Sequence, residues 1–188
     1  MKKLLLAALI MAGISFSAKA QQGSILLYGG LNFYSTNDKN TDVKTSSVIF
    51  TPAVGYQFNK NMTAGLEFGV GAGKSETPSF KVGPFLRYAW PISNIFAIYG
   101  QLGLGYFHQG EANLNNNIDY TNVSGMYIGL SGPTVFINVK NSFGINLGFG
   151  SIDFASGKVK DKDNVSSFAI NFGNNISLGI SKNFGGKR

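Results

Sequence analysis

The chain has 188 residues, of which 44% are hydrophobic and 13% are aromatic, but only 13% are charged. Soluble domains are typically about one-quarter charged, so part of the folded surface must contact something other than water. There is no cysteine, which excludes disulfides, thiolate metal sites and a cysteine-linked lipid anchor.

The pattern of the first 20 residues predicts a secretory signal peptide. Lys2 and Lys3 form a positively charged start, residues 4–14 are apolar, and Ala18-Lys19-Ala20 is a small-x-small cleavage site. The apolar stretch is shorter than the roughly 20 residues of a membrane-spanning helix. We therefore expect one mature domain, residues 21–188. Cleavage removes three lysines and lowers the net charge from +7 to +4. The remaining lysines are scattered, so we expect no nucleic-acid partner.

From residue 24 onward, apolar residues alternate with polar or small ones, which predicts β-strands with one apolar face. The clearest unit is a hairpin at residues 48–71, in which Asn59-Lys60-Asn61 joins two alternating strands. Similar units surround residues 91–94 and 138–141. The pattern predicts eight strands, at about residues 24–34, 48–58, 62–72, 80–90, 96–106, 126–136, 143–150 and 168–184.

The predicted connections alternate between short turns and long polar segments. The long segments are residues 35–45, 73–79, 108–124 and 155–166. Transmembrane barrels have this asymmetry, with short turns on the periplasmic side and longer loops outside. The sequence thus predicts an all-β fold, an eight-stranded antiparallel up-and-down transmembrane β-barrel.

The apolar faces are too bulky to be the inside of such a barrel. Phe, Tyr, Trp, Leu or Ile occupy most of their positions, whereas eight strands enclose a space only just wide enough for side chains. A soluble barrel with an apolar interior is therefore the weaker interpretation. We expect the outward aromatic residues to form two belts at the membrane interfaces: Tyr56, Phe58, Tyr88, Trp90, Phe96, Phe136, Phe143 and Phe184 near the short turns, and Phe33, Phe50, Phe80, Tyr106, Phe149 and Phe168 at the other end.

Three prolines fall inside predicted strands. Pro52, Pro84 and Pro133 each lack the N–H group that a strand contributes to its ladder. Their similar placement before a turn predicts a shared bulge or bend.

A few charged and amide residues occupy inward positions and are the candidate site. We expect Glu67 and Arg87 to lie opposite each other on neighbouring strands and to form an interior salt bridge. The inward positions of Lys81, Gln57 and Gln101 extend the predicted network, together with Tyr28, Tyr99 and Tyr127. The functional alternative for the same residues is a polar gate or ion path.

We find no pattern typical of catalysis or metal binding. His108 is the only histidine, and no serine lies beside it in the sequence to serve as an activated nucleophile. The stretch Asp161-Lys162-Asp163-Asn164 lacks the glycine and the distal glutamate of a calcium loop. We expect the protein not to be an enzyme and to bind no metal and no cofactor.

The signal peptide, the eight amphipathic strands and a last strand that ends in the aromatic Phe184 resemble small OmpA/OmpX-type outer-membrane β-barrels. The resemblance implies a protein of the cell outer membrane in a Gram-negative-type bacterium. It implies contact with outer-membrane lipid and recognition of the last strand by the barrel-assembly machinery. The function that we expect is structural or surface-interacting, through external loops whose partner the sequence does not identify. The alternatives are a narrow porin-like channel and a lipid-modifying enzyme.

Overall fold

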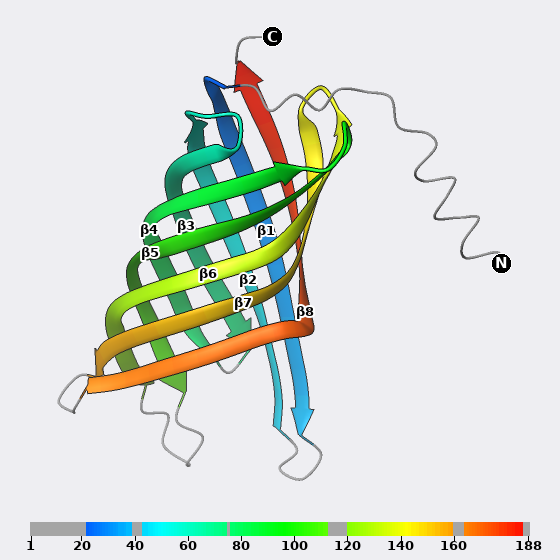
Figure 1. Cartoon of the computed structure of the whole chain (residues 1–188). Helices are drawn as coiled ribbons and strands as arrows, with labels where there is room; N and C mark the ends of the chain where they lie inside the picture. Colours follow the sequence, from blue (N-terminus) through cyan, green and yellow to red (C-terminus); the bar gives the residue numbers. More distant parts are fainter. Residues whose placement is uncertain (1–21, 39–42, 75, 113–119, 160–163, 186–188) are drawn as a thin grey trace.

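The computed structural model describes residues 22–38, 43–74, 76–112, 120–159 and 164–185. In this part of the chain, eight antiparallel strands close into one barrel in sequence order (Figure 1). The predicted fold class is confirmed. The predicted signal peptide, residues 1–20, lies outside the described residues. Among the described residues, no helix has the length and apolar character needed to cross a membrane. The strands are β1 (Ser24–Asp38), β2 (Val43–Gln57), β3 (Met62–Lys74), β4 (Glu76–Pro91), β5 (Phe96–Ala112), β6 (Tyr120–Lys140), β7 (Phe143–Val159) and β8 (Asn164–Gly185).

The strands are longer than the sequence pattern predicted. The shortest has 13 residues and the longest 22, and they extend into the polar segments that we predicted as long loops. Between the strands at this end lie residues 39–42, 75, 113–119 and 160–163. The prediction took polar side chains as a sign that a strand ends, and this was wrong. Polar side chains mark where the chain leaves apolar surroundings, but the hydrogen-bond ladder between strands continues beyond that point.

The three short turns lie at one end of the barrel, together with the start of β1 and the end of β8 (Figure 1). We call this the short-turn end. The tightest of these turns joins β6 to β7 through Asn141 and Ser142, with φ angles of 50° and 60°. Two successive residues with positive φ form a hairpin turn whose twist matches that of the flanking strands.

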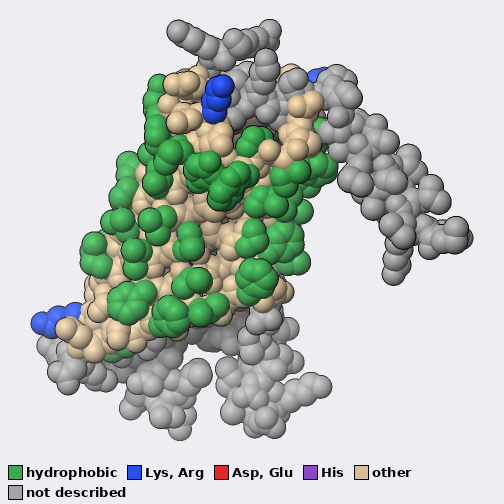
Figure 2. Space-filling model, viewed as in Figure 1, with side chains coloured by type: hydrophobic (Ala, Val, Ile, Leu, Met, Phe, Trp, Pro, Cys, Tyr) green, Lys and Arg blue, Asp and Glu red, His purple; other side chains and the backbone are tan. Residues whose placement is uncertain are grey.

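The bulky apolar residues face outward, as predicted. Figure 2 shows hydrophobic side chains covering the barrel wall. Trp90, Leu66 and Phe50 are 59%, 48% and 44% exposed, whereas inward residues of the same strands, such as Arg87 and Glu67, are buried. In the two predicted aromatic belts, the following side chains are exposed: Tyr56, Phe58, Tyr88, Trp90, Phe143, Phe184, Phe50, Phe80, Tyr106 and Phe168.

Phe136 is an exception, because it faces inward instead of outward. Its cross-strand partner is Asn146, which is only 1% exposed, and its ring covers Gly144. The reason is a register shift between β5 and β6, where residues 132 and 133 stand opposite Gly100 alone. One extra residue reverses the alternation in the rest of β6.

Of the three prolines, only Pro133 lies at a register shift, so the predicted bulge is present there alone. At Pro52, the pairing of β2 with β3 has a gap but resumes in the same register. The pairing of β4 with β5 does the same at Pro84. A missing N–H therefore interrupts the ladder there without inserting a residue.

Inward glycines let neighbouring strands approach closely. A Cβ atom on Gly65 would lie 2.6 Å from the Cα of Gly55, and one on Gly105 would lie 2.6 Å from the Cα of Gly83. Such contacts are impossible for any residue with a side chain. Glycine pairs of this kind allow the strands of a small barrel to bend sharply enough to close.

Candidate functional site: the barrel interior

Arg87, on β4, is buried in the barrel with 6% of its surface exposed. Its Nε and Nη2 atoms donate to Oε1 of Gln101, on β5, at 3.0 and 2.7 Å. Its guanidinium group lies 4.1 Å from the ring centroid of Tyr99 and 5.1 Å from that of Tyr28. Aromatic faces and an amide oxygen thus stabilise the buried cation.

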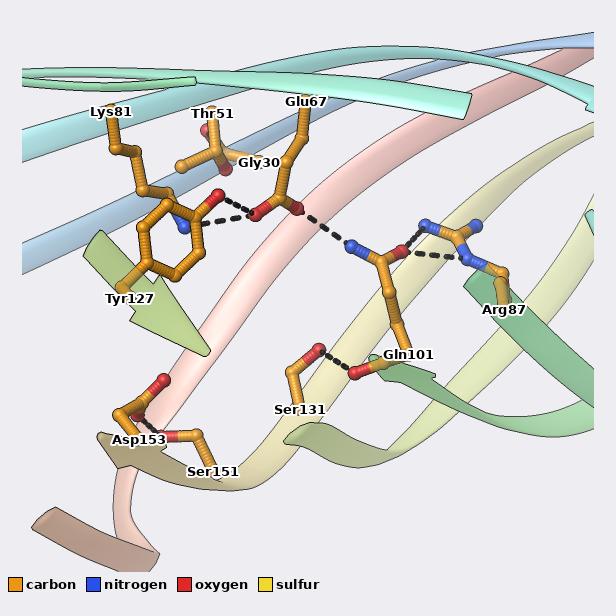
Figure 3. Close-up of polar contacts among 10 residues, drawn as sticks. All are labelled: Gly30, Thr51, Glu67, Lys81, Arg87, Gln101, Tyr127, Ser131, Ser151 and Asp153. Atoms are coloured by element: carbon orange, nitrogen blue, oxygen red, sulfur yellow. Dashed lines mark hydrogen bonds and ion pairs between the residues drawn. The ribbon is translucent and has the colours of Figure 1, made fainter. Parts of the chain in front are cut away.

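Glu67, on β3, is the acceptor at the centre of the network (Figure 3). Its Oε2 accepts a hydrogen bond of 2.7 Å from Nε2 of Gln101. Its Oε1 is 3.3 Å from Nζ of Lys81 and accepts a hydrogen bond of 3.1 Å from the hydroxyl of Tyr127. One carboxylate therefore compensates Lys81 directly and Arg87 through the Gln101 amide.

The predicted direct pairing of Glu67 with Arg87 was wrong. In the ladder between β3 and β4, Glu67 is opposite Gly83, and Arg87 is opposite Thr63. The two charges are therefore four positions apart along β4. The sequence prediction placed the middle of the connection near residues 76 and 77, whereas this register is centred on residue 75, and a shift of this size moves every cross-strand partner.

Gln57 lies outside this network, although we predicted it to be part of it. Its Nε2 donates to the backbone oxygen of Lys60 at 2.9 Å, and its Oε1 accepts from the hydroxyl of Ser24 at 3.2 Å. Both Gln57 and Ser24 are buried. These bonds connect β1 to the turn between β2 and β3 and fill the lumen at the short-turn end.

A second interior chain of hydrogen bonds was not predicted. The hydroxyl of Tyr99 donates to Oδ1 of Asn146 at 3.2 Å, and Nδ2 of Asn146 donates to the hydroxyl of Ser181 at 2.9 Å. Asn146, on β7, is the largest fully buried side chain among the described residues. A signal was present in the sequence, because Asn146 is a polar residue at an inward position between Gly144 and Gly148.

The half of the lumen away from the short-turn end holds a cavity of about 540 Å³. Lys81 and Tyr127 contribute to its lining, and the same two residues contact Glu67. Across the cavity, Asp153 accepts a hydrogen bond of 2.6 Å from the hydroxyl of Ser151. The remaining lining is mostly Ser, Thr, Asn and Gly, with a few apolar residues.

His108 has a serine neighbour that the sequence did not reveal. Its Nδ1 lies 2.7 Å from the hydroxyl of Ser124, the residue opposite it on β6. No hydrogen bond joins His108 to a carboxylate among the described residues. This part of the chain also holds no group of three or more His, Cys, Asp or Glu side chains that could bind a metal ion.

Two solved structures are similar to this chain. The crystal structure of Neisserial surface protein A (NspA) matches with a TM-score of 0.54 and 13% identity, covering 87% of this chain and 98% of that chain. A structure from the de novo design of transmembrane beta-barrels matches with a TM-score of 0.42 and 13% identity, covering 88% of this chain and 99% of the design. No curated protein matches the sequence.

The family is shown by a match between the sequence and a protein-family model. The model of the outer membrane protein beta-barrel domain matches residues 4–184, which is nearly the whole chain. The closed eight-stranded barrel and its apolar outer wall are the features expected of that domain. The chain belongs to the outer membrane protein beta-barrel domain family, and it is a protein of the cell outer membrane.

Proposed function

We propose that this protein is a non-conducting outer-membrane barrel that interacts with its surroundings through its external end. The observation that carries the proposal is the filled lumen at the short-turn end. Arg87 lies close to the rings of Tyr28 and Tyr99, is bonded to Gln101 and is buried inside the barrel. Eight strands leave little free space around such a cluster. This geometry supports a closed barrel over the porin-like alternative.

The proposed orientation places the short-turn end in the periplasm. Short turns are typical of the periplasmic side of these barrels, and longer polar extensions are typical of the outside. The cavity then opens toward the exterior. This orientation supports a structural or surface-interacting role, and it makes outer-membrane lipid the immediate partner. For biogenesis, we propose that the barrel-assembly machinery recognises β8, which ends in the outward Phe184.

Conductance in planar bilayers tests the closed lumen. We expect no steady channel steps from the wild-type protein. The double variant Arg87→Ala/Gln101→Ala removes two large buried side chains from the lumen, so it should produce small, steady steps. The matched control is Tyr88→Ala/Leu102→Ala, which changes the adjacent outward positions of the same two strands and should stay silent. Steady steps from the wild-type protein would overturn the proposal.

We propose further that the protein is not an enzyme. The contact between His108 and Ser124 is the one observation that favours the lipid-modifying alternative. A nucleophile and its base generally need a third group that orients the base. Among the described hydrogen bonds and ion pairs, no carboxylate supplies this for His108. The contact is explained as a cross-strand polar pair near the rim of the barrel.

A further inference from the structure

The two halves of β8 follow different neighbours. From Leu178 to Gly185, β8 pairs with β1. Residues 173–176 then stand opposite the single residue Phe149 of β7, and Gly173 has a φ angle of 75°. Beyond this bulge, residues 164–172 pair with β7 alone among the described residues, while β1 continues along β2 as far as Asp38. Figure 1 shows β8 turning sharply and running away from the far part of β1.

Residues 32–38 of β1 and residues 164–172 of β8 therefore have no described pairing with each other, and we call this unpaired part of the seam the slot. On the β8 side of the slot, Phe168, Ile170 and Phe172 are 66%, 64% and 68% exposed, slightly more than Trp90 and Met126 in the closed wall, which are both 59% exposed. The alternate face of this segment, including Ser167 and Ala169, is exposed as well. Both faces of the strand are therefore open, as expected at an edge.

An unpaired strand edge is costly in hydrocarbon. Backbone N–H and C=O groups that face lipid tails have no water to bond, which is why membrane barrels are normally closed. This edge belongs to a strand whose outward side chains, Phe168 and Ile170, match the lipid-facing wall. Its backbone groups therefore need polar partners within the slot itself.

The cavity is lined by residues from both sides of this slot. Its lining includes Asn32 of β1 on one side of the slot and Asn171 and Ser177 of β8 on the other. Hydroxyl groups also line other parts of the cavity, for example in Ser79 and Ser131. A space of about 540 Å³ with many hydroxyl and amide groups thus borders, at this seam, an apolar outer surface. A molecule that matches both environments has a polar head and an apolar tail.

We propose that the slot admits a membrane lipid from the side, with the polar head group in the cavity and the acyl chain left in the bilayer. The head group supplies hydrogen-bond partners to the cavity and to the β8 edge, and the chain lies between Leu31 and Phe172. The inference deepens the proposed function and rests on it in one respect, because a lumen closed at the short-turn end retains the head group.

Quenching of tryptophan fluorescence by brominated lipid tests this proposal. The chain has a single tryptophan, so a Trp90→Phe background accepts one new reporter at a time. Asn171→Trp reports from the inner side of the slot. Ile170→Trp is the positive control on the lipid-facing side. Ser79→Trp is the negative control, because it lines the same cavity on β4, across the barrel from β8.

In vesicles of phosphatidylglycerol brominated in the acyl chains, we expect the reporter at position 171 to lose nearly as much fluorescence as the one at 170. The reporter at 79 should lose several-fold less. Filling the cavity with Ser131→Phe should reduce the loss at position 171, whereas the matched outward change Leu130→Phe should not. Native mass spectrometry of protein purified from outer membranes then identifies the retained head group.

Equal, weak quenching at positions 171 and 79 would overturn the proposal. Such quenching, combined with cross-linking of two chains through Ile170→Cys, would show that a second copy covers the β8 edge instead. If Ser131→Phe leaves the quenching at position 171 unchanged, lipid lies at the β8 edge but its head group is not in the cavity. This result also contradicts the proposal. These measurements do not depend on conductance. Evidence against lipid in the slot can therefore be distinguished from evidence against a closed lumen.

Discussion

Each charged residue in the lumen depends on a particular set of partners. Among the described residues, Arg87 has no carboxylate in direct contact and relies on Gln101 and on the rings of Tyr28, Phe85 and Tyr99. Glu67 accepts from three different side chains. Removing one partner of a buried charge lowers the stability of the fold strongly. The remaining charge stays buried and keeps its desolvation penalty, but it no longer has the interaction that offset the penalty. Glu67 is thus the position on which the network depends most.

Glu67→Ala should therefore destabilise the barrel. It leaves Lys81, Tyr127 and the Gln101 amide without their acceptor, at a cost of about 1–3 kcal/mol for each buried donor left unpaired. Lys81 is 38% exposed, so water offsets part of its loss. The measurement is the temperature at which the folded band disappears in detergent gels. Asp153→Ala is the control, since its one described bond is to Ser151. Equal melting of Glu67→Ala and wild type would reject the network.

At the scale of strands, close backbone contacts shape the wall. A Cβ atom at Gly65 would lie 2.1 Å from the backbone oxygen of Val54, and only movement of β2 away from β3 could relieve this. By contrast, a Cβ atom at Gly100 would meet nothing nearer than 3.8 Å. The two glycines therefore differ in how much space their neighbours leave for a side chain.

Gly65→Ala should lower barrel stability by about 1–3 kcal/mol, the usual cost of overpacking. Gly100→Ala should stay within about 0.5 kcal/mol of wild type, as expected for a change that touches nothing. Urea unfolding in lipid vesicles, followed by Trp90 fluorescence, measures both. If Gly100→Ala were the more damaging of the two, the described contact between β2 and β3 would be wrong.

The strands also show that the alternation of apolar and polar residues predicts inward and outward positions only as far as the next bulge. Residues 96–106 alternate without interruption, and the predicted faces of β5 are those observed. In β6, the insertion at Gly132 and Pro133 reverses the pattern, so Phe136 points into the lumen. Nothing in the local sequence distinguishes a proline that shifts the register from Pro84, which does not.

The whole molecule is a barrel that is filled at one end, hollow at the other and slotted along one side. The apolar outer wall requires a bilayer, because no soluble protein of this size exposes hydrophobic residues over its entire wall. The family match begins at residue 4, within the segment that we predict is cleaved on export. Processing is therefore a separate question from membership of the family.

We expect the mature protein in the outer membrane to begin at Gln21. The positively charged start, the short apolar stretch and Ala18-Lys19-Ala20 together favour cleavage after Ala20. Intact-mass spectrometry of protein purified from outer membranes measures the loss of residues 1–20 directly. Replacing the small residues with Ala18→Leu/Ala20→Leu should block processing and leave the full-length mass. A full-length mass for the wild-type protein would contradict the prediction.

The sequence by itself determined the fold class, the number of strands and the face that meets lipid. These follow from side-chain periodicity, residue volume and the limited space inside eight strands. It also identified Glu67, Lys81, Arg87 and Gln101 as inward residues. Only the tertiary structure decided that Glu67 contacts Lys81, that Gln57 lies elsewhere and that β8 leaves β1. Those facts depend on strand register and on bulges. Neither can be deduced from the number of residues that separates two partners in the sequence.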